Sequence, residues 1–176
     1  MNRREYIHCD NKYFDELDLK TKIRLYITGD HWIAIRKYLS YLRSQEYYMT
    51  RYGMLGKLAS LYFARKKNKL GLKLGFHISA NVLGTGVSIY HHGAIIVNGD
   101  AKIGKNCVLH GMNCIGNNGK SKGVPIIGDN VDIGAGASII GGVRIADDVK
   151  IGAGAVVIKD CLEPGATLVG VPAKQV

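Results

Sequence analysis

Two adjacent histidines are the residues of this sequence best suited to acid–base chemistry. His91 and His92 lie in the segment GVSIYHHG (residues 86–93). Imidazole has an unperturbed pKa of ~6.5, so a histidine can take a proton from a hydroxyl group and return it to a leaving group. The apolar residues Val87 and Ile89 mark a buried row, which leaves the histidine pair on an exposed corner with no packing role. We expect one of the two to be a general base, and the periodicity does not choose between them.

This corner belongs to a six-residue repeat that organises the second part of the chain. From Ile127 the sequence reads IGDNVD, IGAGAS, IIGGVR, IADDVK, IGAGAV and VIKDCL. The first position is always Ile or Val, the fifth is a small or medium-sized apolar residue, and the third and fourth favour Gly, Asp or Asn. This pattern predicts short strands separated by corners, and three such edges close a coil of about 18 residues. Counting back from Val157 gives roughly four to five coils.

The part before the repeat has a helical pattern. Only 5 of the 23 glycines lie in residues 1–75. We expect one helix over residues 19–28 between Asp18 and Gly29, a second that starts after Asp30, and a third over about 54–69. Apolar side chains of these helices are expected to form a core, among them Trp32, Leu55, Leu58, Leu61 and Tyr62. Residues 1–74 are thus predicted to form a helical N-terminal domain, and residues 75–176 a repeat domain with a short C-terminal tail.

Charge divides at the same place. Residues 1–75 hold 16 Lys and Arg against 7 Asp and Glu, so most of the formal net charge of +10 belongs to the helical part. The densest cluster, residues 65–69 with Lys73 nearby, is either a solvated helix end or a peripheral contact with an anionic membrane surface or polysaccharide. A nucleic-acid partner would rest on this charge alone, and we expect none.

Targeting signals and disulfides are not expected. The charged residues at 1–6 precede no apolar segment, and no stretch approaches ~18 uninterrupted apolar residues, so neither a secretory signal nor a membrane span is predicted. The cysteines show no CxxC spacing and are interpreted as reduced, which favours a cytoplasmic protein. They are Cys9, Cys107, Cys114 and Cys161.

Four segments resemble the hexapeptide-repeat acyltransferases, in particular serine acetyltransferases and their relatives in polysaccharide loci. The segments are GVSIYHHGAIIVN (86–98), CIGNNGKS (114–121), IGAGASIIGGVRIADDVKIGAGAVV (133–157) and GVPAK (170–174). The resemblance covers residues 75–176 closely and the helical part in outline. It implies a mainly β fold with a helical N-terminal part, in which the repeat forms a left-handed parallel β-helix. It also implies acetyl transfer from acetyl-coenzyme A in a homotrimer with active sites between neighbouring solenoids, which the helical part could double into a dimer of trimers.

The resemblance places the family's catalytic histidine on His91 and leaves His92 as the weaker alternative. In serine acetyltransferases an aspartate of an Asp-x-His segment orients this base, but the matching residues here are Gly75-Phe76-His77. Asn98, His77 or a backbone carbonyl would have to orient His91 instead, and the sequence does not decide which. The oxyanion of the tetrahedral intermediate is expected to meet a backbone N–H group in the 117–119 loop.

The acceptor side departs from the serine enzymes. Their aspartate before the catalytic histidine is replaced by Tyr90, and their Arg-His-Pro by Gly123-Val124-Pro125 in a loop two residues shorter. The missing groups bind the amine and carboxylate of an amino acid, whereas a tyrosine suits packing on a sugar ring. We therefore expect acetylation of a sugar hydroxyl in capsule or exopolysaccharide biosynthesis, with serine O-acetylation in cysteine biosynthesis as the alternative.

The donor side is better preserved. Small residues at the corners would let the pantetheine arm approach the backbone, although glycine also serves simply to turn a corner. Two lysines are candidates for the phosphates of the coenzyme, with solvated surface positions as the alternative. The residues expected to contact acetyl-coenzyme A are Gly116, Asn117, Lys120, Gly134, Ala135, Gly152, Ala153 and Lys174.

Two other classes of protein use a solenoid of this kind. A zinc-dependent hydratase would need a close-spaced histidine pair across a coil, which is absent, so no metal is expected. A solenoid that serves only as a scaffold would fail to bind coenzyme A.

Overall fold

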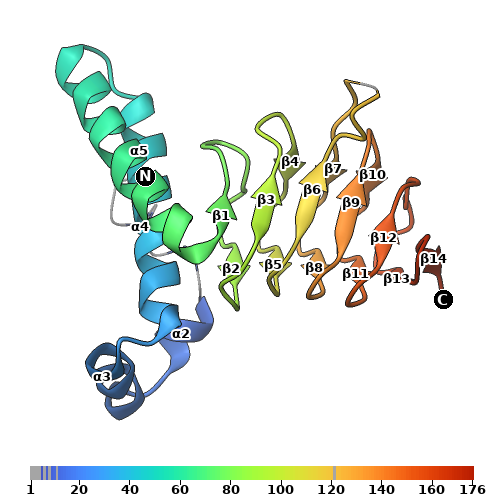
Figure 1. Cartoon of the computed structure of the whole chain (residues 1–176), viewed down its shortest axis with the longest axis horizontal. Helices are drawn as coiled ribbons and strands as arrows, with labels where there is room; N and C mark the ends of the chain where they lie inside the picture. The colour runs from blue at the N-terminus through green and yellow to red at the C-terminus, as the bar shows by residue number, and fades with distance from the viewer. Residues whose placement is uncertain (1–4, 6, 8, 11, 121) are drawn as a thin grey trace.

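The computed structural model describes residues 5, 7, 9, 10, 12–120 and 122–176. Helices α2 (Lys12–Glu16), α3 (Leu19–Thr28), α4 (His31–Met49) and α5 (Met54–Leu74) come first. Short strands then stack along one axis away from the helices (Figure 1). No helix in the described part of the chain is long and apolar enough to cross a membrane.

The helix ends follow their capping residues. The Asp18 side chain accepts a hydrogen bond from Thr21 N at 2.9 Å, and Gly29 ends α3 with a left-handed φ of 65°. Asp30 caps α4 by accepting from Trp32 N at 3.0 Å. These two predicted starts are confirmed. The third helix, α5, extends past the predicted end at residue 69 to Leu74.

The predicted inward face of α5 is wrong. Leu55, Leu58, Leu61 and Tyr62 are 54–83% exposed. The helix instead approaches its neighbours through small residues, and a Cβ on Gly71 would lie only 2.6 Å from Phe76 O. The core of the helical part comes from the middle of α4, which buries Ile35, Tyr38, Leu39 and Leu42. A hydrophobic pattern marks an apolar face without showing which side meets a partner.

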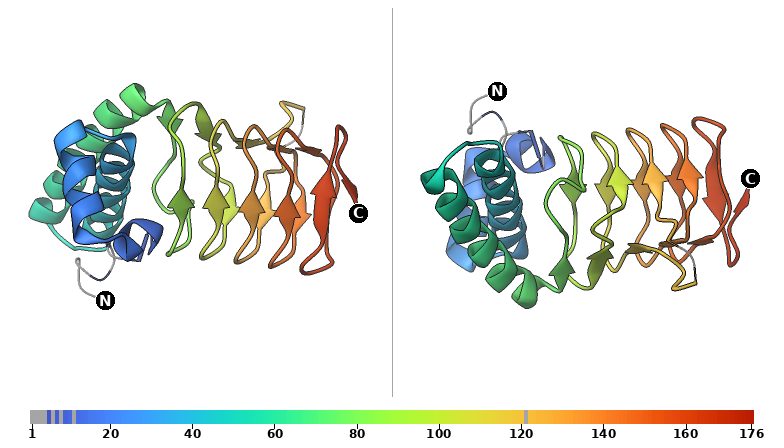
Figure 2. Two further views of the ribbon diagram at one scale, coloured as in Figure 1. Left: turned by 90° about the horizontal axis from the view of Figure 1, so that it is seen from below. Right: turned by 90° about the horizontal axis from the view of Figure 1, so that it is seen from above.

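The strands form three parallel sheets wound around a common core (Figure 2). In every sheet the hydrogen-bonded neighbours are non-consecutive in sequence apart from β13 and β14, as a coil requires. The first sheet contains β1 (Phe76–His77), β3 (Ile95–Val97), β6 (Cys114–Gly116), β9 (Ser138–Ile140) and β12 (Val156–Val157); the second contains β4 (Lys102–Ile103), β7 (Ile126–Ile127) and β10 (Arg144–Ile145). The third contains β2 (Ser88–Ile89), β5 (Val108–Leu109), β8 (Asp132–Ile133), β11 (Lys150–Ile151), β13 (Thr167–Val169) and the antiparallel β14 (Lys174–Gln175). The predicted parallel β-helix is confirmed.

The repeat positions have the roles expected of them. Aliphatic first positions stack into buried ladders, such as Leu109, Ile133 and Ile151 along the third sheet. Corners use residues that tolerate a left-handed backbone, with φ of 57° at Asn130 and 62° at Asp148. Asn130 Nδ2 donates to Asp148 Oδ1 at 3.0 Å, so the polar corner residues also bond one coil to the next.

A buried arginine joins the helical part to the start of the solenoid. Arg43 on α4 donates from Nε to Asp10 Oδ2 at 2.7 Å and from Nη1 to Glu46 Oε2 at 2.9 Å. The same Nη1 donates to Leu83 O at 2.9 Å, and Nη2 donates to Gly84 O. Because Leu83 of the first coil pairs with Ile103 of the second, this network ties the position of α4 to the solenoid.

Candidate active site

The histidine pair lies on an exposed corner directly after β2. The next coil carries Gly111 at the equivalent place, where a Cβ would lie 3.3 Å from both Cβ and O of His91. Gly111 also has a φ of 119°, which side chains rarely adopt. Position 111 of the next coil therefore carries no side chain beneath His91, and both histidines are exposed to solvent.

The start of α4 reaches this corner, which the sequence did not reveal. The ring centroid of His31 lies 5.8 Å from that of His91 with an interplanar angle of 27°, and 5.3 Å from that of His92. Trp32 lies 6.0 Å from Tyr90, centroid to centroid, so this tryptophan is a half-buried neighbour of the corner rather than a core residue. No local sequence signal links a helix start to a distant corner. Only the docking of α4 brings them together.

A histidine and an aspartate from successive coils form a pair beside Tyr90. His110 Nε2 is 2.8 Å from Asp132 Oδ1, and the His110 ring meets the Tyr90 ring edge-on with centroids 4.8 Å apart. The two residues come from β-strand positions on successive coils, one following β5 and one within β8. A carboxylate oxygen at this distance can accept a hydrogen bond from an N–H at His110 Nε2. Their contact depends on the register between coils, and neither residue stood out in the sequence.

The structure shows no contact of Asn98 or His77 with His91 among the described residues, so their predicted orienting role stays a prediction. Asn98 Oδ1 accepts a hydrogen bond from Asp100 N at 2.9 Å, and His77 lines a cavity of about 520 Å³ with Leu72 and Ile96. The ring that the structure places against His91 is that of His31.

The backbone at position 75, where the resemblance implies an orienting aspartate, does not favour a side chain. Gly75 ends α5 with a φ of 80°, and a Cβ there would lie 2.8 Å from the carbonyl carbon and oxygen of Gly93. A residue with a side chain would be strained and would clash.

The glycines expected to line the coenzyme groove are also needed by the stacking of the coils. A Cβ on Gly134 would lie 2.6 Å from Ala153 N, and one on Gly152 would lie 3.0 Å from Val169 Cγ1. The adjacent Ala135 and Ala153 are exposed, so the corners present small side chains to solvent. Gly116, whose nearest Cβ contact would be at 3.7 Å, has no such steric requirement.

Two backbone amides of the loop at residues 117–120 are already bonded within it. Asn117 Oδ1 accepts from Gly119 N at 3.2 Å, and Asn118 Oδ1 accepts from Lys120 N at 3.0 Å. The first of these bonds engages the Gly119 N–H, which is one of the three backbone N–H groups expected to stabilise the oxyanion, and both bonds help to define the conformation of the loop. Lys120 is exposed here, whereas Lys174 lies on β14 beside a cavity of about 300 Å³.

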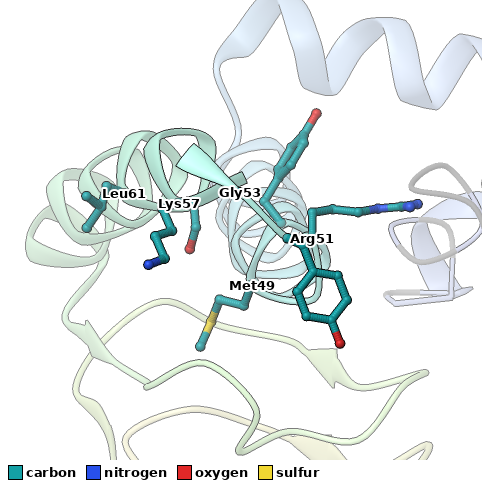
Figure 3. A pocket seen from close by; sticks show the side chains of 8 residues that line it. Met49, Arg51, Gly53, Lys57 and Leu61 are labelled. Atoms are coloured by element: carbon teal, nitrogen blue, oxygen red, sulfur yellow. The ribbon is translucent and has the colours of Figure 1, made fainter. Parts of the chain in front are cut away.

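Two hollows of the helical part share no residue with the histidine corner. One, of about 610 Å³, lies between the end of α4 and the start of α5, and its walls include Met49, Arg51 and Lys57 (Figure 3). The other, of about 240 Å³, is lined by the basic side chains Lys37, Lys66, Lys69 and Lys73 together with Tyr41 and Leu70. Among the described residues, no group of three or more His, Cys, Asp or Glu side chains could hold a metal ion.

Comparison with known proteins agrees with this fold. Residues 125–159 match the family model described as bacterial transferase hexapeptide (six repeats). A probable serine acetyltransferase of Oryza sativa subsp. japonica is 38% identical over 130 residues, which cover 67% of this chain and 42% of that protein. The chain thus spans less than half the length of this curated relative.

Solved structures give the same result. The serine acetyltransferase of Neisseria gonorrhoeae matches 99% of this chain and 66% of its own, with 35% identity and a TM-score of 0.69. That of Brucella abortus strain S19, in complex with coenzyme A, matches 80% of this chain and 56% of its own, with 26% identity and a TM-score of 0.66.

The fold and the matched repeat define a left-handed parallel β-helix of hexapeptide type. The chain belongs to the hexapeptide-repeat transferases, and serine acetyltransferases are its homologues. The expected preference for a sugar acceptor is wrong, because these relatives support the serine alternative and not a polysaccharide enzyme. The error came from treating the groups missing at Tyr90 and in the loop as the whole acceptor site. The fold adds His31, His110 and Asp132 to the same corner.

Proposed function

We propose that this protein transfers the acetyl group of acetyl-coenzyme A to the hydroxyl of L-serine, the reaction that supplies O-acetylserine for cysteine biosynthesis. The observation that carries the proposal is the exposed histidine corner of a hexapeptide β-helix whose homologues are serine acetyltransferases. The coenzyme A complex of the Brucella abortus relative supports acetyl-coenzyme A as donor.

His91 acts as the general base in this proposal. Its imidazole takes the proton of the serine hydroxyl while the hydroxyl oxygen attacks the thioester carbonyl carbon. The tetrahedral intermediate then collapses, the carbon–sulfur bond breaks, and the same imidazole returns the proton to the coenzyme A thiolate. No acyl-enzyme is required. His92, on the same corner, is the alternative base.

Serine binding must be achieved without the acids and bases of the family's usual acceptor site. An ammonium or carboxylate group that loses water without a partner costs several kcal/mol, on the order of what binding can supply. Asp132, whose side chain is 48% exposed, brings a carboxylate to the neighbourhood of Tyr90 through His110. We propose this pair as the partner of the serine amine.

The donor would follow the groove formed by the small corner residues Ala135 and Ala153, beside Gly134 and Gly152. Gly116 and Asn117 would contribute backbone groups from the edge of the loop. Lys120 and Lys174 would meet phosphates.

We also propose a homotrimer, because a single solenoid provides one wall of such a groove. Apolar side chains remain exposed on it, including Ile96 at 49% and Met112 at 67%. The exposed apolar side of α5, with Leu58 and Leu61, supports further association into a dimer of trimers. A cytoplasmic setting is supported by the four cysteines, which are all free.

The decisive experiment is a thiol-release assay with acetyl-coenzyme A and a panel of acceptors that contains L-serine, nucleotide sugars and oligosaccharides, with mass spectrometry of the product. We expect O-acetylserine. Thiol release with a sugar and none with serine would contradict the proposal, and failure to bind coenzyme A in calorimetry would favour a scaffold. Light scattering that shows only monomer at micromolar concentration would contradict the assembly.

A further inference from the structure

A buried ring nitrogen without a hydrogen-bond partner lies at the edge of the histidine corner. Nε2 of His31 is shielded from solvent and has no partner among the described residues. Leaving such a group unsatisfied costs about 1–3 kcal/mol, so it is rarely retained without a use. The His31 side chain as a whole is 30% exposed while Nε2 is buried, so Nε2 is the end directed into the protein.

Asp30 places a carboxylate oxygen beside the other ring nitrogen of His31. Its Oδ1 lies 3.2 Å from His31 Nδ1, and the same oxygen accepts the hydrogen bond from Trp32 N at 3.0 Å. The helix cap therefore holds the carboxylate in place. A carboxylate at this distance favours the proton on Nδ1, which leaves a lone pair on Nε2. The unpartnered nitrogen is consequently a hydrogen-bond acceptor.

The rings in contact with that of His31 are those of Trp32 and of the two histidines of the corner. An N–H···N hydrogen bond of about 2.9 Å between facing ring edges places the two centroids about 5 Å apart. The observed separations are 5.8 Å to His91 and 5.3 Å to His92. The His91 ring is stacked on that of His31, so a hydrogen bond between them requires a rotation of the His91 side chain that turns a ring nitrogen towards His31 Nε2. Hydrogen bonds of catalytic groups are often long before substrate binds.

A general base needs such an acceptor. One nitrogen of His91 must be unprotonated towards the serine hydroxyl, which requires that the other carry the proton and be held by a partner. The family's aspartate cannot stand at position 75, where Gly75 meets Gly93.

We propose that the Asp30–His31 pair orients the catalytic imidazole of His91. His31 Nε2 accepts the N–H of the His91 nitrogen that faces away from the substrate, and Asp30 stabilises, through His31, the positive charge that His91 gains when it takes the hydroxyl proton. His31 is in this sense a positioning residue that acts through His91. The inference rests on the proposed function for its kinetic consequences only, since the hydrogen bond itself can be observed without a reaction.

The test compares three substitutions with one control. His31→Phe keeps a ring of similar shape and removes both nitrogens, whereas His31→Gln keeps an acceptor oxygen. Asp30→Asn keeps a good helix cap and removes the charge. Asp18→Asn makes the same change at the start of α3, where Asp18 bonds only to its own first turn, and serves as the control.

We expect His31→Phe to lower kcat by about 10- to 100-fold, less than the ~10²–10⁴-fold loss of a general base itself, with the KM values for serine and acetyl-coenzyme A nearly unchanged. His31→Gln should recover part of that loss, Asp30→Asn should fall between wild type and His31→Phe, and Asp18→Asn should match wild type. The ¹⁵N resonances of labelled histidine should show one neutral tautomer for His91 in the wild type and a mixture in His31→Phe. Should His31→Phe not fold, His31→Gln and Asp30→Asn supply the same comparison.

A His31→Phe protein with wild-type kcat and an unchanged His91 tautomer would overturn the inference. Equal losses in His31→Phe and His31→Gln without a change in the His91 resonances would also overturn it, because they would assign His31 a packing role. If the resonance that changes belongs to His92, the assignment to His91 is wrong. A wild type that does not acetylate serine would overturn the proposed function, and the resonances would still decide the His31–His91 bond.

Discussion

Arg43 holds the helix that carries His31 against the solenoid, and its replacement by alanine should destabilise the protein strongly. The side chain is 1% exposed, and its partners include the carboxylates of Asp10 and Glu46, each 2% exposed. Nε and Nη2 donate to the two Asp10 oxygens at 2.7 and 3.2 Å, while Nη1 serves Glu46 and the carbonyl of Leu83. Arg43→Ala leaves the Asp10 carboxylate buried without its cation and leaves Glu46 with the electrostatic attraction of Lys67 alone.

The size of the effect follows from these contacts. Removing one partner of a buried ion pair costs about 3–5 kcal/mol, and an unsatisfied buried carbonyl about 1–3 kcal/mol more. The loss is limited because Asp10 Oδ1 still accepts from Gly86 N at 2.9 Å and Glu46 Oε1 from Asn81 N at 2.8 Å. We expect a decrease of about 4 kcal/mol in the free energy of unfolding, a large part of the ~5–15 kcal/mol of a typical domain.

Urea unfolding at fixed protein concentration measures this loss, with the fluorescence of the single tryptophan, Trp32, as the signal. Arg36→Ala is the matched control on the same helix, because Arg36 pairs with Asp15 of α2 and the two side chains are 28% and 40% exposed. An exposed pair contributes about 0–1 kcal/mol. If the free energy of unfolding of Arg43→Ala lies within about 1 kcal/mol of the wild-type value at an unchanged m-value, the hydrogen bonds and ion pairs of Arg43 do not hold α4 to the solenoid as described.

Three further predictions concern single residues. His91→Ala should lose about 10²–10⁴-fold in kcat and keep coenzyme A binding by calorimetry, whereas His92→Ala should lose less; the reverse ranking would move the base to His92. Burial lowers the pKa of Lys67 below its usual 10.5, so the unfolded chain binds more protons between the two values. The free energy of unfolding of the wild type minus that of Lys67→Met should therefore rise with pH through that window, and parallel urea titrations from pH 7 to 10 would show a constant difference if this is incorrect. Burial raises the pKa of the Cys107 thiol to about 11, so iodoacetamide at pH 8 should label it only after denaturation; peptide mass spectrometry that finds rapid labelling of the native protein would refute the assignment.

The solenoid could be predicted because its information is local and repeated. Ile133 and Ile151 each occupy the first position of a hexapeptide and indicate a buried row of side chains. Every coil repeats the same six-residue pattern and so adds an independent observation of it. Helix starts were equally local, since Asp18 and Asp30 bond to backbone groups two or three residues away. The acceptor was predicted wrongly because Tyr90 was judged from its own segment alone.

The sequence by itself determined the period, the coil, the helix caps and the exposure of the histidine corner, because each depends on contacts within a few residues or on a pattern that recurs along the chain. Only the tertiary structure decided what stands beside that corner. His31 reaches His91 because Arg43 fixes α4 against the first coil, and His110 meets Asp132 because two coils stack in one register. Such contacts join residues distant in sequence through rigid-body packing, in which the free energy is shared among many side chains. No single residue type or spacing in the sequence predicts these contacts.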